Sequence, residues 1–133
     1  DFCLSRGLGD VYKRQVYDVV KMLRGMYDLR IPILITENGK GNYVFEPRLG
    51  KTVRDNGRIE YLKGFLHWME KANDEGLNIA GYYAWSLMDN IEWSAGTMVK
   101  YGLIRTNFRT FETAWKKSAY FYRDYIAAHR CGG

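Results

Sequence analysis

Two short stretches of the sequence place carboxylates where they could do chemistry. In the first, Glu37, Asn38 and Gly39 directly follow the apolar run 33–36. The second stretch holds two indoles and two carboxylates within nine residues: Trp85, Asp89, Glu92 and Trp93. Indoles offer flat faces to the C–H surface of a sugar, and carboxylates accept hydrogen bonds from its hydroxyl groups. The mixture favours a carbohydrate site.

Each feature also has a simpler structural explanation. Glu-Asn-Gly is ordinary turn sequence. Trp85 alone would more commonly be a core indole, because aromatic side chains carry much of the burial energy of a core, and Glu92 alone would be a solvated acid in a loop. The functional interpretation is favoured because both stretches follow a predicted strand and would meet at one rim.

Hydrophobic periodicity predicts helices and strands in alternation around these stretches. The expected elements are helices at 16–27, from 59 to a stop at Gly76, and at 113–129, strands at 33–36 and 79–87, and a long loop at 40–56. This alternation is typical of an α/β fold with a parallel sheet. Barrels of this class place their active sites at the carboxyl ends of the strands, which is where both stretches lie.

Length and charge exclude several classes of protein. A chain of 133 residues is shorter than the about 250 residues of a closed eight-stranded β/α barrel, so it can supply only part of one. There are 20 Lys and Arg against 15 Asp and Glu, but the basic residues are scattered, which argues against nucleic-acid binding. No apolar run reaches the ~18 to 20 residues that cross a bilayer, and the first residues lack the order of a signal peptide.

The two ends of the chain differ from the middle. Residues 1–15 show no clear periodicity and resemble translated adaptor sequence, so we expect them to be non-native and to carry no selected chemistry. Residues 16–129 are expected to form the domain, and 130–133 a tail. The cysteines, Cys3 and Cys131, lie in these end segments, and their spacing fits neither a metal site nor a disulfide framework.

Several separate motifs resemble one known family. The segment ILITENG at 33–39 resembles the nucleophile motif of glycoside hydrolase family 1, the β-glucosidase and β-galactosidase group. RIEYL at 58–62 and GYYAWSLMDNIEW at 81–93 resemble later blocks of the same family. The similarity continues through 100–104 to 117–120. Separate motifs in the right order are more specific than one tripeptide.

The resemblance implies an incomplete (β/α)8 TIM barrel, of which this chain is the C-terminal part with the last two βα units. It implies a retaining β-glycosidase in which Glu37 is the catalytic nucleophile and forms a covalent glycosyl-enzyme. The implied substrate-binding residues are Trp85, Glu92, Trp93 and Tyr101. The implied partner is a small or oligomeric β-glycoside. Neither a metal nor a cofactor is implied, because carboxyl groups suffice for the reaction.

The main departure from the family pattern is a missing acid/base residue. The family takes it from the Glu of an Asn-Glu-Pro motif, which occurs nowhere in these 133 residues, so the fragment alone is predicted to be inactive. A non-catalytic carbohydrate-binding remnant and a thioglucosidase-type relative stay open as alternatives. The family's phosphoglycosidase branch carries a lysine in the last loop where this chain has Val99, which favours unphosphorylated sugars as substrates.

Overall fold

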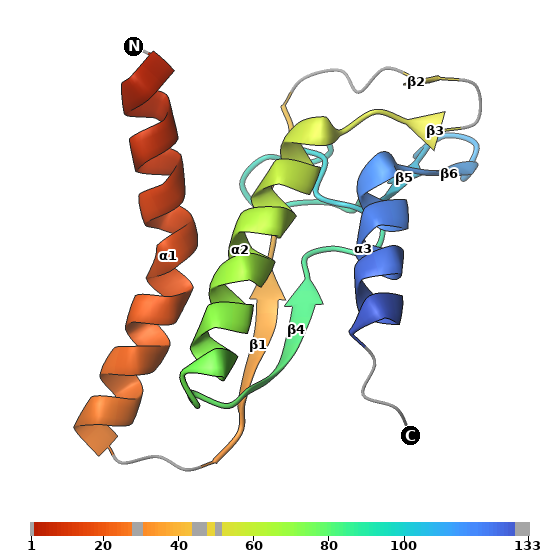
Figure 1. The fold of residues 1–133 in the computed structure, drawn as a ribbon. Coiled ribbons are helices and arrows are strands. Elements are labelled where there is room, and N and C mark those ends of the chain that lie inside the picture. Colours follow the sequence, from red (N-terminus) through yellow and green to blue (C-terminus); the bar gives the residue numbers. More distant parts are fainter. Residues whose placement is uncertain (1, 28–30, 44–47, 50–51, 130–133) are drawn as a thin grey trace. The chain divides into compact units, whose positions relative to one another are not determined.

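The computed structural model describes residues 2–27, 31–43, 48–49 and 52–129, with side chains for 12–27, 31–43 and 52–129. The chain forms two compact units, the first comprising Asp1–Thr36 and Tyr61–Tyr83 and the second Glu37–Glu60 and Ala84–Gly133. The elements are α1 (Phe2–Tyr27), β1 (Ile33–Asn38), β2 (Arg48–Leu49), β3 (Thr52–Val53), α2 (Asn56–Asp74), β4 (Ile79–Ala84), β5 (Ile104–Thr106), β6 (Thr113–Trp115) and α3 (Lys117–Ala128) (Figure 1). The predicted tail at 130–133 lies outside the described residues.

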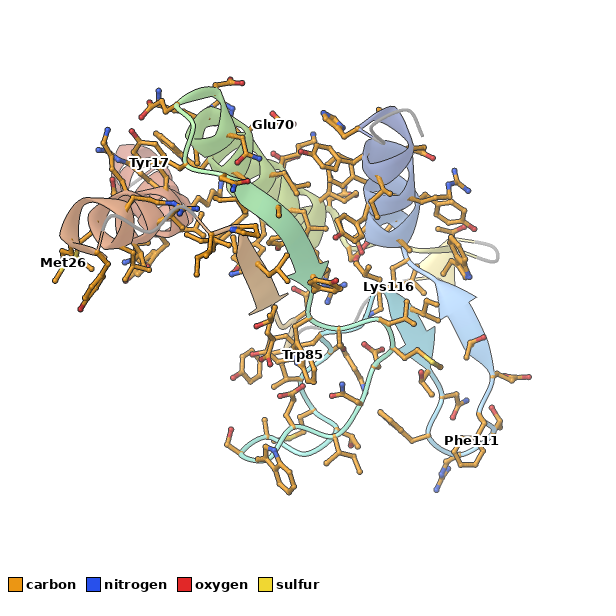
Figure 2. All side chains as sticks on the ribbon, turned by 90° about the horizontal axis from the view of Figure 1, so that it is seen from below. Tyr17, Met26, Glu70, Trp85, Phe111 and Lys116 are labelled. Carbon is orange, nitrogen blue, oxygen red and sulfur yellow. The ribbon has the colours of Figure 1, made fainter. Side chains whose placement is uncertain are left out.

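The first unit packs α1 and most of α2 beside β1 and β4 (Figure 1). Its buried apolar side chains recur every three or four positions along the helices, as the periodicity predicts. They are Tyr17, Val20, Leu62, Phe65, Leu66, Met69 and Ala72, together with Ile79 of β4. The rings of Tyr17 and Trp68 lie 5.5 Å apart between centroids, and Figure 2 shows Tyr17 on the side of α1 that faces α2.

Helix α1 is longer than the predicted helix at 16–27, because it begins at Phe2. The sequence shows no clear periodicity before residue 16, and residues 2–15 nevertheless continue the helix. The segment 2–15 contains no proline, and six of its fourteen residues are Leu, Arg, Lys or Gln, which are favourable helix formers. Once a helix has nucleated, each added residue gains a hydrogen bond at little cost. Whether residues 1–15 are native stays a prediction.

Strands β1 and β4 pair in a two-stranded sheet and run in the same direction, as predicted (Figure 1). The N–H of Ile33 donates to the carbonyl oxygen of Asn78 at 3.0 Å, and the N–H of Trp85 donates to that of Asn38 at 2.8 Å. Strand β4 ends at Ala84, three residues before the predicted end at 87, because the backbone of Ser86 bonds to Tyr101 and Leu103 instead.

Helix α2 ends at the predicted glycine stop. Gly76 has a φ of 77°, which is a left-handed conformation that glycine adopts at low cost. Its N–H donates to the carbonyl oxygen of Asn73 at 2.9 Å, and the N–H of Leu77 donates to that of Ala72 at 2.9 Å. These two bonds make a Schellman motif, which satisfies carbonyls that the helix end leaves free and leads the chain into β4.

The second unit contains a hairpin that the periodicity missed. Strand β6 pairs antiparallel with β5, with Ile104 opposite Trp115 and Thr106 opposite Thr113. The prediction of a helix from residue 113 was therefore wrong, and α3 begins only at Lys117. Thr and Trp are favoured in strands, and pairing with β5 overrides the helical spacing of Trp115 and Ala119. The expected loop at 40–56 likewise contains the short antiparallel pair β2–β3.

Among the described residues, no helix combines the length and the apolar character needed to cross a membrane.

One polar cluster stabilises the end of α2 against α1 in the first unit. The Tyr17 hydroxyl donates to Glu75 Oε2 at 2.6 Å, and Lys71 Nζ lies 2.9 Å from Glu75 Oε1. Lys21 Nζ lies 3.3 Å from Glu75 Oε2. The hydrogen bond from Tyr17 and then that from Lys71 lower the pKa of Glu75 from 4.5 to about 2. The hydrogen bond from Lys21 to the Tyr17 hydroxyl, at 2.8 Å, and then the contact with Glu75 raise the pKa of Lys21, and the hydrogen bond to Glu75 raises the pKa of Lys71.

We expect Glu75→Gln to make stability less dependent on pH in acid. Because the pKa of Glu75 is lowered from 4.5 to about 2 in the folded state, the stabilisation that its carboxylate gives is present above the unfolded value of 4.5. That stabilisation disappears as the pH falls towards the folded value. The thermal midpoint, followed by circular dichroism from about pH 6 to pH 2, should fall less steeply in the variant. Asp74→Asn, at the neighbouring exposed acid, is the control, and equal slopes for wild type and Glu75→Gln would contradict the role of the cluster.

Candidate active site

Glu37 lies at the carboxyl end of β1, where a strand end of an α/β sheet presents its reactive groups. It is the fifth of the six residues of β1, and its side chain is exposed. The next residue, Asn38, accepts the N–H of Trp85 through its carbonyl oxygen at 2.8 Å. The two motifs that the sequence singled out are therefore joined by a backbone hydrogen bond at one strand end, as predicted.

Trp85 directly follows β4 (Figure 2), and its side chain contacts Glu92, a predicted site residue. Its indole Nε1 donates to Glu92 Oε1 at 3.3 Å. Trp85 is 38% exposed, so part of the residue is accessible to a ligand. The peptide bond between Trp85 and Ser86 is cis. A partly exposed indole beside a carboxylate is the mixture of side chains that the sequence predicts for binding a sugar.

Glu92 and Trp93 lie in a tight turn. The N–H of Glu92 donates to the carbonyl oxygen of Gly96 at 2.9 Å, and the N–H of Gly96 returns a bond to that of Glu92 at 2.8 Å. Gly96 has a φ of 57°, which favours glycine. The turn exposes Trp93 completely, with a relative exposure of 105%, so the structure brings Glu92 to Trp85 and leaves Trp93 projecting into solvent.

Tyr101 is half-buried and lies against the loop that follows Glu37. A Cβ built at Gly41 would come within 2.7 Å of Tyr101 Cζ and 2.4 Å of Val99 Cγ1, so the Tyr101 ring packs on the bare backbone of this loop. The carbonyl oxygen of Tyr101 accepts the N–H of Ser86 at 3.3 Å. The predicted residues Glu37, Trp85, Glu92 and Tyr101 thus share the second unit and are linked through neighbouring backbone.

Two further glycines, Gly39 and Gly102, permit close contact between backbone segments near the site. A Cβ on Gly39 would lie 1.8 Å from the carbonyl oxygen of Trp85, and one on Gly102 would lie 2.1 Å from the backbone nitrogen of Asp89. Real Cβ atoms do not approach backbone atoms so closely. Each glycine therefore determines how tightly the loop after Glu37, or the segment after Tyr101, can pack.

Buried charges support the segments that carry the site, and sequence reasoning missed most of them. Asp89, grouped above with the sugar-facing carboxylates, is only 3% exposed. Its Oδ1 accepts the N–H of Gly102 at 2.9 Å and Lys116 Nζ at 2.9 Å. Asp89 belongs to the stretch that favoured a carbohydrate site, but its carboxylate is buried and fixes the backbone next to Tyr101.

A second buried pair joins the starts of two helices. Arg58 is 1% exposed and Asp55 is 4% exposed, and Arg58 Nη1 donates to Asp55 Oδ2. Asp55 also accepts the N–H of Ser118 at 2.9 Å and the Ser118 hydroxyl. The spacing of Asp55 and Arg58 by three residues at a helix start is the one signal in the sequence that could have indicated this pair.

The model of glycosyl hydrolase family 1 matches residues 10–131. This chain belongs to glycosyl hydrolase family 1. The prediction made from the motifs is confirmed, and with it the hydrolase class of the family to which the parent protein belongs.

Relatives that are similar to this chain include glycosidases. Over 118 residues the chain is 36% identical to β-glucosidase A of Acetivibrio thermocellus, covering 87% of this chain and 25% of that protein. It is 41% identical over 115 residues to a 6-phospho-β-galactosidase of Staphylococcus epidermidis, covering 86% of this chain and 24% of that protein. A crystal structure of a β-glucosidase from Exiguobacterium marinum superimposes with a TM-score of 0.80 at 40% identity, covering 90% of this chain and 26% of the other.

The chain spans about a quarter of the length of the family members that it matches. The solved members are TIM barrels, and the described part of this chain is a piece of such a barrel without closure. This confirms the predicted fold class. It also explains why apolar side chains of the paired strands, such as Leu34 and Tyr83, are 53% and 60% exposed.

Gly39→Ala should destabilise the loop after Glu37. Because the added Cβ would overlap the Trp85 carbonyl oxygen, we expect a loss of about 1 to 3 kcal/mol, the usual cost of overpacking. The free energy of unfolding is measured by urea titration with tryptophan fluorescence. Gly25→Ala in α1 is the matched control. A Cβ at Gly25 would meet nothing within 4 Å, so this change should stabilise by about 0.5 to 1 kcal/mol. Two variants of equal stability would contradict the steric argument.

Proposed function

We propose that this segment supplies the nucleophile and part of the sugar-binding surface of a retaining β-glycosidase. The observation that carries the proposal is the contact of Trp85 Nε1 with Glu92 Oε1 at 3.3 Å, beside the end of the strand that presents Glu37. Trp85 would stack on the sugar, and Glu92 would accept hydrogen bonds from its hydroxyls. Trp93 and Tyr101 would complete the surface around the same sugar.

Glu37 would attack the anomeric carbon of a β-glycoside. The bond from that carbon to the departing oxygen breaks while the bond to the Glu37 carboxylate forms, and water then releases the sugar. A retaining enzyme needs a second carboxyl group roughly 5 Å away to protonate the departing oxygen. The family motif for that group is absent from these 133 residues. The chain by itself would therefore bind a sugar weakly and hydrolyse nothing.

The experiment uses what we call the barrel chimera, in which residues 16–129 replace the matching quarter of the Exiguobacterium marinum β-glucosidase. With an aryl β-glucoside, the barrel chimera should turn over substrate and the 133-residue chain alone should not. Glu37→Gln in the barrel chimera should lower kcat on the order of 10³-fold or more, as expected when a covalent nucleophile is lost. The exposed Glu112→Gln is the control. Turnover that survives Glu37→Gln would exclude Glu37 as nucleophile.

The 41% identity to a 6-phospho-β-galactosidase favours a second candidate, a phosphoglycosidase. The negative charge of the site's carboxylates favours the first candidate, a glycosidase that acts on unphosphorylated sugars. A phosphate group carries about −1.5 to −2 at neutral pH and would be repelled by Glu37 and Glu92. Lys100 Nζ is already bonded to the carbonyl oxygen of Thr97 at 2.7 Å and lies 4.5 Å from the Phe108 ring centroid. Val99, at the position of the branch's lysine, is 2% exposed and apolar.

Substrate choice separates the two candidates. The barrel chimera should hydrolyse an aryl β-glucoside with a kcat/KM at least about tenfold above that for the aryl 6-phospho-β-galactoside, because each 1.4 kcal/mol of repulsion in the transition state gives a factor of ten. The intact Exiguobacterium marinum enzyme is the reference. The reverse preference would overturn the first candidate and support the second.

A further inference from the structure

Arg58 donates to the backbone of two separate segments of the candidate active site. Its side chain is 2% exposed. Arg58 Nε donates to the carbonyl oxygen of Lys40 at 3.2 Å, and Nη2 donates to that of Lys100 at 2.5 Å. Nη1 donates to Asp55. One planar group therefore bonds simultaneously to a carboxylate and to two carbonyls that are far apart in the sequence.

Both carbonyls lie next to predicted site residues. Lys40 is three residues after Glu37 and stands between Gly39 and Gly41, which pack on Trp85 and on Tyr101. Lys100 immediately precedes Tyr101. The two segments also pair directly, because Asn42 and Lys100 exchange backbone hydrogen bonds of 3.0 Å in each direction. The Arg58 guanidinium thus reinforces a junction whose two sides carry the proposed nucleophile and the Tyr101 ring.

We propose that Arg58 is a positioning residue for the proposed glycosidase site, holding the loop after Glu37 at a fixed distance from the segment of Tyr101. The inference rests on the proposed function for its catalytic consequence, while the placement of the two backbone segments stands on the contacts alone. Arg58 is buried and acts through the backbone that it holds. Misplacement of reacting groups by about 1 Å can cost on the order of 100-fold in rate, so a fixed distance at this junction has catalytic value.

The geometry requires arginine rather than a positive charge in general. A lysine could still neutralise Asp55, but its single ammonium group ends a flexible stem and cannot reproduce the rigid fork of five donors. Arg58→Lys therefore separates two roles. If Arg58 only balances the buried charge of Asp55, the Arg58→Lys variant should retain activity. If Arg58 positions the two carbonyl groups, the Arg58→Lys variant should lose activity.

The test compares Arg58→Lys with Leu62→Ala, its matched control. Leu62 lies one turn further along α2, is 1% exposed and belongs to the core of the first unit. In the barrel chimera, Arg58→Lys should lower kcat/KM for an aryl β-glucoside about tenfold or more, with KM raised as well as kcat lowered. Leu62→Ala should lower the thermal midpoint at least as much as Arg58→Lys does. It should leave kcat/KM within about twofold of the value for the wild-type chimera. The activity of both variants is measured at a temperature well below their thermal midpoints. The expected loss of kcat/KM in Arg58→Lys follows from the rate cost of misplaced reacting groups. The expected fall of the thermal midpoint in Leu62→Ala follows from the stability cost of a core cavity.

Hydrogen exchange tests the placement without any substrate. In the full chain and in the barrel chimera, Arg58→Lys should speed amide exchange in 39–42 and 100–103, and Leu62→Ala should leave these two segments unchanged. Unchanged exchange in Arg58→Lys, or equal losses of kcat/KM in the two variants, would overturn the proposal. A wild-type chimera that hydrolyses no β-glycoside would defeat the proposed function, and the exchange pattern would then decide the role of Arg58 by itself.

Discussion

The second unit depends on the buried ion pair between Arg58 and Asp55. Removing two charges from water costs several kcal/mol each, and only close pairing with additional hydrogen bonds offsets that cost. Here the additional bonds go to backbone, from Arg58 to Lys40 and Lys100 and from Ser118 to Asp55. The pair therefore fixes where α2 begins, where α3 begins and how the two loops of the candidate site meet.

A second buried ion pair likewise bonds to backbone, at the residue that follows Tyr101 in the sequence. Lys116 and Asp89 have fully buried side chains 2.9 Å apart, and Asp89 also accepts the N–H of Gly102. The backbone before Tyr101 is thus held by a cation and the backbone after it by an anion. Breaking either pair would leave an uncompensated buried charge, which is more costly than losing a surface salt bridge. The position of the Tyr101 ring follows from these constraints more than from its own contacts.

The sequence predicted the elements whose signals are local. The helix stop at Gly76, the two parallel strands predicted at 33–36 and 79–87, and the meeting of the Glu37 and Trp85 stretches at one strand end follow from periodicity, turn residues and spacing, although the second strand ends at Ala84. It failed where tertiary pairing overrides local preference, as in the hairpin at Thr113–Trp115, which has helical spacing but pairs with β5. It also failed for Asp89 and Lys116, because 27 residues separate the two partners of that buried pair and no periodicity links them.

The charges of this unit fall into two classes with different tasks. Asp55 and Asp89 are buried and bonded to cations and backbone amides, through both oxygens of Asp55 and Oδ1 of Asp89, so these oxygens serve the fold. Glu37 is exposed, and Glu92 is partly exposed with one oxygen bonded to the Trp85 indole. A carboxylate that must form and break bonds with a sugar has to keep its lone pairs available, and it needs a backbone that does not yield. The site therefore needs both kinds of charge: buried charges that hold the backbone and accessible charges that contact the ligand. A site built only from accessible carboxylates would lack a fixed geometry.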